Sequence, residues 1–168
     1  MEVETEWGLS FNPSKSQAID ITNRRMMDEL QLRMHGTLLT QVQEFRYLGV
    51  WVDASLSWER QIQESCADCM TRIRAIRRLC ASYWGLHPQV VERLIKAIVF
   101  PRLFYGVSAW GGVVRWVKRL RPITRILRLS AVVTLGLLST TSEAKALAVC
   151  GWLPADLEVR LAVVCFIL

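Results

Sequence analysis

The spacing of apolar residues divides the chain into a mixed first third and a helical remainder. Short apolar stretches separated by turn residues predict a strand over 17–21 and a hairpin in which 30–34 and 37–43 flank a His35-Gly36 turn. Residues 45–53, FRYLGVWVD, alternate aromatic and aliphatic side chains and predict one further strand. The pattern predicts an α+β fold, with a small N-terminal antiparallel β-hairpin region followed by a mainly α-helical bundle.

A helical stripe dominates the region after residue 57. Ser57 is expected to cap this helix and Gly85 to end it. Apolar residues follow alternating steps of four and three, at Ile62, Cys66, Cys69, Ile73, Ile76, Cys80 and Tyr83. CADC at 66–69 has the form of metal and redox sites. However, the chain has no second such pair, and an odd total of five cysteines. Core packing is therefore the favoured interpretation of these cysteines.

Proline, glycine and capping residues predict the later helices. Pro88 suits a first helical turn, and Pro101 is expected to bend or break that helix before Gly106. Residues 140–143 form a capping-box pattern for a helix that ends at Gly151. A last helix starts near Pro154 and runs into the apolar ending CFIL, so we expect the chain to stop inside a helix. The predicted segments are 1–56, 57–112 and 113–168.

The apolar content is moderate for a chain of this length. Of 168 residues, 52% are hydrophobic and 21% charged, and no apolar run reaches the roughly 18–20 residues of a membrane span. The N-terminus is acidic and lacks the pattern of a signal peptide. These features favour an intracellular protein, nuclear or cytoplasmic, with no membrane partner.

Basic residues are concentrated in one central block. The net charge is −5 over residues 1–71, +12 over 72–128 and −1 over 129–168. The block contains RIRAIRR at 72–78 and RWVKRLRPITRILR at 115–128. On a helix the second cluster places Trp116, Leu120, Ile123 and Leu127 on one face, and Pro122 is expected to kink or restart it. A solvated basic face and a membrane-surface helix are alternatives to phosphate binding.

Four segments resemble one known family in their order and spacing. GLSFNPSKSQAI, EFRYLGVWVDASLSWERQI, IVFPRLFYGVSAW and TTSEAKALAVCGWLPADLEVR are similar to segments of insect non-LTR (LINE-type) retrotransposon Pol polyproteins. The resemblance places the chain in the C-terminal region of the reverse transcriptase. It implies the end of the palm, the primer-grip hairpin, the thumb and the connection. The earlier part of the palm is then expected to lie outside this chain.

The resemblance also implies roles for particular residues. Lys15 matches the palm-motif lysine, but without the aspartates nearby an exposed loop lysine with no catalytic role is the preferred interpretation. Tyr47, Leu48 and Gly49 match primer-grip positions, although the hairpin core is the preferred interpretation for Leu48 and Val50. Tyr47 is expected to share a face with Trp51. The thumb-like helices are expected to contact nucleic-acid phosphates through Arg72, Arg74, Arg78, Arg115, Lys118, Arg119 and Arg125.

The sequence departs from a complete polymerase in its carboxylates. Polymerisation needs clustered aspartates that hold two Mg²⁺ ions, whereas Asp20, Asp28 and Asp53 stand singly. We therefore expect a non-catalytic reverse-transcriptase fragment without its own metal or cofactor, with Mg²⁺ bound in the intact parent enzyme. Its expected partners are an RNA/DNA template–primer duplex and the missing palm and fingers. The alternatives are a stand-alone basic helical RNA/DNA-binding module and an inert relic or interaction domain.

Overall fold

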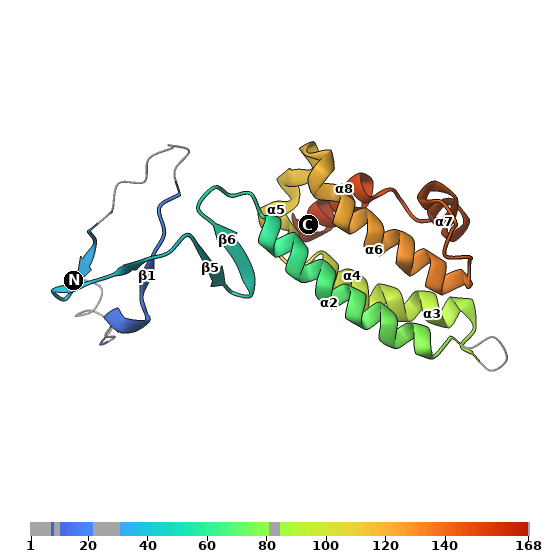
Figure 1. The fold of residues 1–168 in the computed structure, drawn as a ribbon, viewed down its shortest axis with the longest axis horizontal. Helices are drawn as coiled ribbons and strands as arrows, with labels where there is room; N and C mark the ends of the chain where they lie inside the picture. The colour runs from blue at the N-terminus through green and yellow to red at the C-terminus, as the bar shows by residue number, and fades with distance from the viewer. Residues whose placement is uncertain (1–7, 9–10, 22–30, 81–84, 168) are drawn as a thin grey trace. The chain divides into compact units, whose positions relative to one another are not determined.

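The computed structural model describes residues 8, 11–21, 31–80 and 85–167 (Figure 1). The chain divides into two compact units, Met1–Ser57 and Trp58–Leu168. Small strand pairs make up the first unit and helices the second, which confirms the predicted α+β class. Residue 30, the first of the predicted hairpin, lies outside the described residues.

The first unit is built from short strand pairs. After a 3-10 turn, η1 (Pro13–Lys15), strand β1 (Gln17–Ala18) pairs in parallel with β4 (Thr40–Gln41). Strands β2 (Arg33–Met34) and β3 (Thr37–Leu38) form an antiparallel hairpin. Its turn is the predicted His35-Gly36 pair, and both residues have positive φ, 49° and 77°. This combination is the backbone of a tight two-residue hairpin turn.

The predicted strand over 45–53 is wrong in one respect, because it is two strands. Strand β5 (Glu44–Tyr47) pairs antiparallel with β6 (Val50–Asp53), and Leu48 and Gly49 form the turn with φ of 47° and 88°. Alternation continues across a two-residue turn, so the pattern alone does not reveal the reversal. The hairpin implied by the family resemblance is the correct description.

Reversal of the chain also changes which side chains share a face. Tyr47 is paired with Val50, whereas Trp51 is paired with Arg46. Directly paired residues lie on one face of a ladder and successive residues alternate. Tyr47 and Trp51 therefore lie on opposite faces of the hairpin, so the expectation that they share one is wrong.

The second unit is a bundle of helices and short helical turns. Its elements are α2 (Glu59–Arg78), α3 (Pro88–Leu94), the π-helical η2 (Ile95–Val99), α4 (Phe100–Leu103), α5 (Val107–Trp110), the 3-10 turn η3 (Gly111–Arg115), α6 (Val117–Leu135), α7 (Glu143–Cys150) and α8 (Ala155–Ile167). Figure 1 shows α2 and α6 as long neighbouring helices, and they pack on one another along their length.

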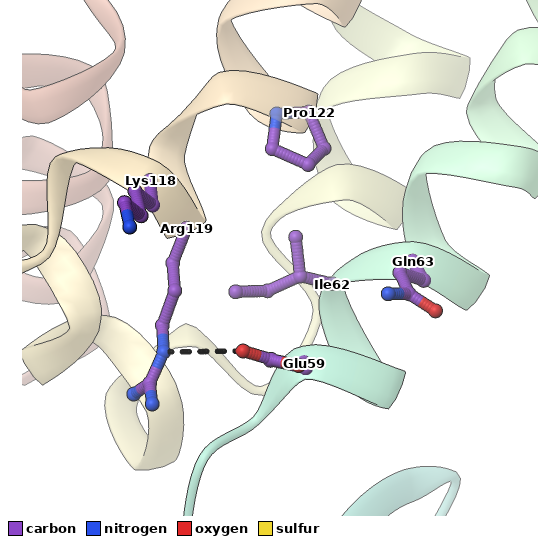
Figure 2. A pocket seen from close by; sticks show the side chains of 6 residues that line it. All are labelled: Glu59, Ile62, Gln63, Lys118, Arg119 and Pro122. Atoms are coloured by element: carbon purple, nitrogen blue, oxygen red, sulfur yellow. Dashed lines mark ion pairs between the residues drawn. The ribbon is translucent and has the colours of Figure 1, made fainter.

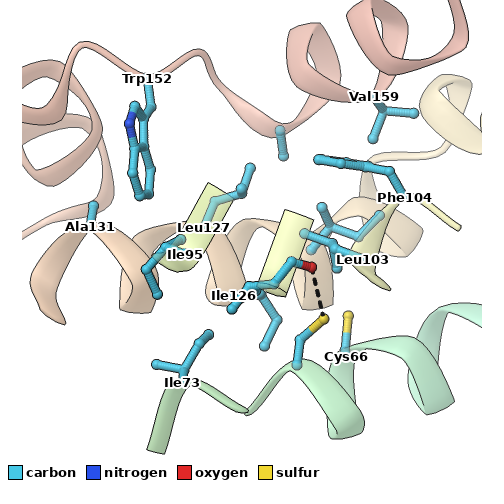
Figure 3. Close-up of a cluster of buried hydrophobic side chains, with 14 of the residues drawn as sticks. Cys66, Ile73, Ile95, Leu103, Phe104, Ile126, Leu127, Ala131, Trp152 and Val159 are labelled. Carbon is cyan, nitrogen blue, oxygen red and sulfur yellow. Dashed lines mark hydrogen bonds between the residues drawn. The ribbon is translucent and has the colours of Figure 1, made fainter. Parts of the chain in front are cut away.

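One apolar core joins these helices (Figure 3). Cys66 and Cys69 point into it from α2, and the Cys69 thiol donates to the Val99 carbonyl at 3.6 Å. Burial raises the pKa of each of the two thiols to about 12, which keeps them protonated. The helical stripe thus predicted the inward face of α2 correctly from Ile62 to Ile76, and both cysteines of the CADC segment are core residues. Of the rest of the predicted stripe, Cys80 follows the end of α2, and Tyr83 lies outside the described residues.

Helix ends differ from the predicted caps at three places. Helix α2 ends at Arg78 with Leu79 as its C-cap, before the expected Gly85. The N-cap of α2 is Trp58, with φ 61°, while the Ser57 N–H donates to the Asp53 carboxylate at 2.8 Å. The N-cap of α7 is Ser142, so the helix starts later than the expected Thr140 cap. Pro88 at the start of α3 and Gly151 at the end of α7 agree with the sequence pattern.

The two internal prolines behave differently. Pro101 follows the widened π-helical turn η2, and the helix ends at Leu103 before Gly106, as expected. Pro122 lies inside α6, which continues without a restart from Val117 to Leu135.

Of the helices that the structure describes, none is long and apolar enough to cross a bilayer.

Candidate nucleic-acid interface

A groove follows the seam between α2 and α6. Its first part, about 200 Å³, is shown in Figure 2 and is lined by Glu59, Ile62, Gln63, Lys118, Arg119 and Pro122. The adjoining part, about 410 Å³, shares Pro122 and is lined further by Cys66, Ala67, Met70, Arg121, Arg125 and Ile126. We call the two parts together the α2–α6 groove. Its floor is apolar, and its α6 wall is basic.

The local sequence of α6 explains this division. Leu120, Ile123 and Leu127 recur at helical spacing and are buried against the core. Lys118 and Arg125, on the other side of the same helix, are exposed to solvent. The cations of α6 are therefore presented to solvent beside the groove because the apolar stripe fixes the rotation of the helix.

Helix α2 contributes cations at the far end of the seam. Arg77 lines a further depression of about 310 Å³ together with Arg128 of α6. Arg74 lies four residues after Met70 and three before Arg77, so it occupies the same stripe of α2. Residues near the N-terminus of α2 lie beside residues near the N-terminus of α6, and residues near the C-terminus of α2 lie beside residues near the C-terminus of α6. The two helices therefore run in the same direction, and their basic positions extend along one seam.

Four of the predicted contact arginines do not line the groove. Arg72 is on the opposite flank of α2, where its guanidinium lies 3.3 Å from the Asp68 carboxylate. Arg102 of α4 contacts the same carboxylate at 2.5 Å. Arg78 is exposed near the end of α2. Of the predicted contact residues, Lys118, Arg119 and Arg125 line the groove. Arg72 takes part in an ion-pair network between α2 and α4. Arg74, Arg78 and Arg115 are exposed but do not belong to the groove lining.

Arg119 links the two walls of the groove. Its Nε atom lies 3.9 Å from Glu59 Oε1 across the seam, as Figure 2 shows. The guanidinium also lies over the Trp116 ring, 5.5 Å from its centroid. Arg115 is exposed in the turn immediately before Trp116.

Arg128 binds backbone carbonyls, unlike the neighbouring cations of α6. Its Nε donates to the Thr141 carbonyl at 2.8 Å, and its NH2 group donates to the Ser139 carbonyl. These bonds tie the loop before α7 to α6. The planar guanidinium suits this double contact.

The carboxylates of Asp68 and Glu92, near the basic block, form ion pairs with neighbouring cations. For Asp68, burial disfavours ionisation, but the hydrogen bonds from Arg102 and Arg72 outweigh it and lower the pKa of the carboxyl. Glu92, the one acid within residues 72–128, lies 2.7 Å from Lys96 and accepts from the Trp152 indole N–H at 3.3 Å. The basic positions of the groove therefore face few competing negative charges.

The predicted palm and primer-grip positions lie in the first unit. Lys15 is exposed at the end of η1, two residues before β1. Tyr47 and Leu48 are 62% and 76% exposed at the tip of the β5–β6 hairpin, so the expected core role of Leu48 is wrong. Within the described residues, no group of three or more His, Cys, Asp or Glu side chains could hold a metal ion.

Three cations that line the seam were missing from the expected contact set: Arg128, which binds backbone carbonyls, and Arg77 and Arg121. The sequence feature that could have indicated Arg77 is its helical spacing from Met70 on α2. The signal for Arg121 is its place beside Pro122 on α6. Both signals become informative only once the pairing of α2 with α6 is known.

Comparison with known proteins identifies several relatives. The chain is 32% identical over 110 residues to the RNA-directed DNA polymerase from mobile element jockey of Drosophila funebris, covering 66% of this chain and 12% of the relative. It is 25% identical over 167 residues to the Pol polyprotein from type-1 retrotransposable element R1 of Nasonia vitripennis, covering 94% of this chain and 50% of the relative. The R1 Pol polyprotein of Bradysia coprophila is 24% identical over 127 residues, covering 76% of this chain and 13% of the relative.

The chain spans about half or less of the length of these relatives. No protein-family model matches it, and no solved structure matches it significantly. The relatives nevertheless agree with one another, and R1 and jockey matches together cover most of the chain. The chain is therefore similar, over most of its length, to the Pol proteins of non-LTR retrotransposons of the R1 and jockey type.

Proposed function

We propose that this chain is the primer-grip and thumb part of a non-LTR reverse transcriptase and that it binds the template–primer duplex through the α2–α6 groove. The observation that carries the proposal is the row of basic side chains that α6 presents along its seam with α2, which Arg77 of α2 continues at the far end. Similarity to an RNA-directed DNA polymerase supports nucleic acid as the ligand.

The dimensions of the seam suit a duplex. Helix α6 has 19 residues, which corresponds to a length of about 28 Å. One strand of a duplex carries a phosphate about every 3.4 Å along the axis, so the length of α6 corresponds to about eight such steps, and the phosphates on the facing side of the duplex lie within its reach. Arginine predominates among the cations, and its guanidinium can bind phosphate oxygens in pairs. Such contacts give affinity without reading sequence.

The chemistry of nucleotide addition is assigned to other parts of the parent protein. Asp20 and Asp53 stand on separate segments of the first unit and do not fit the clustered carboxylates of a two-metal site. Lys15 is proposed to act on the departing pyrophosphate only when the aspartate-bearing palm is present, because a lone exposed lysine has no reacting group to assist.

The proposal is tested with two charge-matched double variants and a fluorescent RNA–DNA hybrid. Lys118→Gln with Arg125→Gln removes two groove cations, and Lys145→Gln with Arg160→Gln removes two exposed cations on α7 and α8. Charged contacts contribute about 1 kcal/mol or more each, so the groove variant is expected to bind about 30-fold more weakly. The control is expected to stay within about twofold of the unmodified chain.

Equal weakening of both double variants would contradict the proposal. That result would show that total charge, rather than the arrangement along the groove, sets the affinity. Circular dichroism of each variant checks that the helices are retained, since all four side chains are polar and outside the core.

A further inference from the structure

Trp116 differs from the other tryptophans of the chain. The structure describes five of the seven tryptophans, and among these five Trp116 alone is exposed, with 61% of its surface accessible. Trp110, six residues earlier, is 1% exposed, and its indole N–H donates to the Tyr105 carbonyl at 2.9 Å. A large aromatic ring on the surface is a ready contact for a planar ligand.

Core packing and backbone hydrogen bonds fix the position of the backbone at Trp116. The preceding turn η3 packs into the core through Gly111 and Val113, both of which are buried. The Trp116 N–H donates to the Val113 carbonyl at 2.8 Å, and the Trp116 carbonyl accepts from the Arg119 N–H at 2.9 Å. The ring is therefore presented from a junction that is hydrogen-bonded on both sides.

Cations surround the ring at the end of the groove. Arg119 lies over the indole at 5.5 Å and also contacts Glu59 in the groove. Lys118 lines the same end of the groove, and Arg115 is exposed beside the ring in sequence. An exposed aromatic side chain among cations is the arrangement by which proteins hold single-stranded nucleic acid, because bases stack on the ring while phosphates meet the charges.

Resting on the proposed function, we propose that Trp116 stacks an unpaired nucleobase of the single-stranded template extension where it leaves the duplex. The base stacks on the indole face opposite Arg119, and Arg115 and Lys118 contact the adjoining phosphates. The site takes any base, since stacking does not read the hydrogen-bonding edges.

The test compares a blunt RNA–DNA hybrid, the same hybrid with a five-nucleotide RNA extension, and the free RNA strand. Trp116→Ala is expected to weaken binding of the extended hybrid and of the free strand by about fivefold or more, and that of the blunt hybrid by less than about twofold. Trp116→Phe, which retains an aromatic face, is expected to restore most of the affinity. The dependence of the affinity on salt is expected to stay unchanged, because no charge is removed.

Two outcomes would overturn the inference. One is equal affinity of Trp116→Ala and the unmodified chain for the extended hybrid and the free strand. The other is a loss confined to binding of anionic phospholipid vesicles, which would assign the ring to a membrane surface. If the free strand binds through Trp116 but no duplex binds, the groove proposal fails and the stacking site stands. If the duplex binds normally and Trp116→Ala has no effect, only the stacking site fails.

Discussion

Gly111→Ala tests how closely α8 packs on the turn that leads to Trp116. A Cβ at Gly111 would lie 2.4 Å from Val163 Cγ2 of α8, far inside van der Waals contact. The neighbouring Gly112 is a matched control, since a Cβ there would meet nothing within 4 Å. Both glycines belong to η3 and have φ outside the left-handed region, so alanine strains neither backbone.

The expected cost follows from the ways in which the clash can be relieved. Val163 is β-branched and strongly prefers one rotamer in a helix, so either its side chain leaves that rotamer or α8 moves outward. Overpacking of this kind costs about 1–3 kcal/mol. Both alanines also gain about 0.4–1 kcal/mol from the reduced entropy of the unfolded chain. This gain cancels in the comparison, so Gly111→Ala is expected to be about 1–3 kcal/mol less stable than Gly112→Ala.

Urea unfolding followed by far-ultraviolet circular dichroism measures the difference, with the slope m checked for constancy. In a Val163→Ala background the difference between the two alanine variants is expected to fall below about 0.5 kcal/mol, because the clashing methyl group is absent. Equal stability of Gly111→Ala and Gly112→Ala in the unmodified background would refute the close packing of α8 on η3.

Three further predictions concern protonation and backbone strain. Cys66 and Cys69 are expected to resist thiol reagents at pH 8. Because their folded pKa of about 12 lies above the ordinary value of 9.0, their contribution to stability is full below pH 9 and is lost as the pH rises from 9 through 12, which alkaline unfolding measures. Asp68→Asn weakens the contact with Arg102 and is expected to lower stability by about 0.5–1 kcal/mol at pH 7 in urea unfolding. Because the pKa of Asp68 is lowered on folding, this difference is present above the ordinary value of 3.8 and disappears as the pH falls through the folded pKa. Leu48→Asn suits the left-handed φ of 47° better and is expected to stabilise the β5–β6 hairpin by about 0.5–1 kcal/mol, measured by amide hydrogen exchange of the hairpin.

The hairpin shows where sequence patterns reach their limit. Alternation of apolar and polar residues predicted extended structure over 45–53, and the structure contains it. The turn itself gave little signal, because Leu48 replaces the Asn or Asp that usually precedes glycine in such turns. The resemblance to the retrotransposon family supplied the reversal that local propensity could not.

Trp116 shows a second limit, at a helix end. A helical projection places Trp116 on the face of Leu120 and Ile123, but the helix begins at Val117, and Trp116 has an extended backbone with φ −113° and ψ 95°. The projection does not apply to a residue outside the helix. The sequence pattern therefore placed Trp116 on the apolar face of the helix, whereas its ring is exposed.

The groove depends on contacts that are distant in sequence. The inward face of α2 and the buried positions of α6 follow from helical spacing, and both were predicted. The meeting of Met70 with Arg125 across the seam depends on how the two helices pair, which a single sequence does not specify. The predicted boundary between segments 57–112 and 113–168 stays a prediction.

The most direct test of the central claim is the salt dependence of binding to a blunt RNA–DNA hybrid. Affinity is measured between 50 and 200 mM salt for the unmodified chain and for the two charge-matched double variants, and log K is plotted against log salt. If Lys118 and Arg125 contact phosphates, their replacement by glutamine lowers the magnitude of the slope by about 1.8, or about 0.9 for each contact, whereas the Lys145 and Arg160 control keeps the slope of the unmodified chain. An unchanged slope for the groove variant would contradict the assignment of the α2–α6 groove to the nucleic-acid backbone.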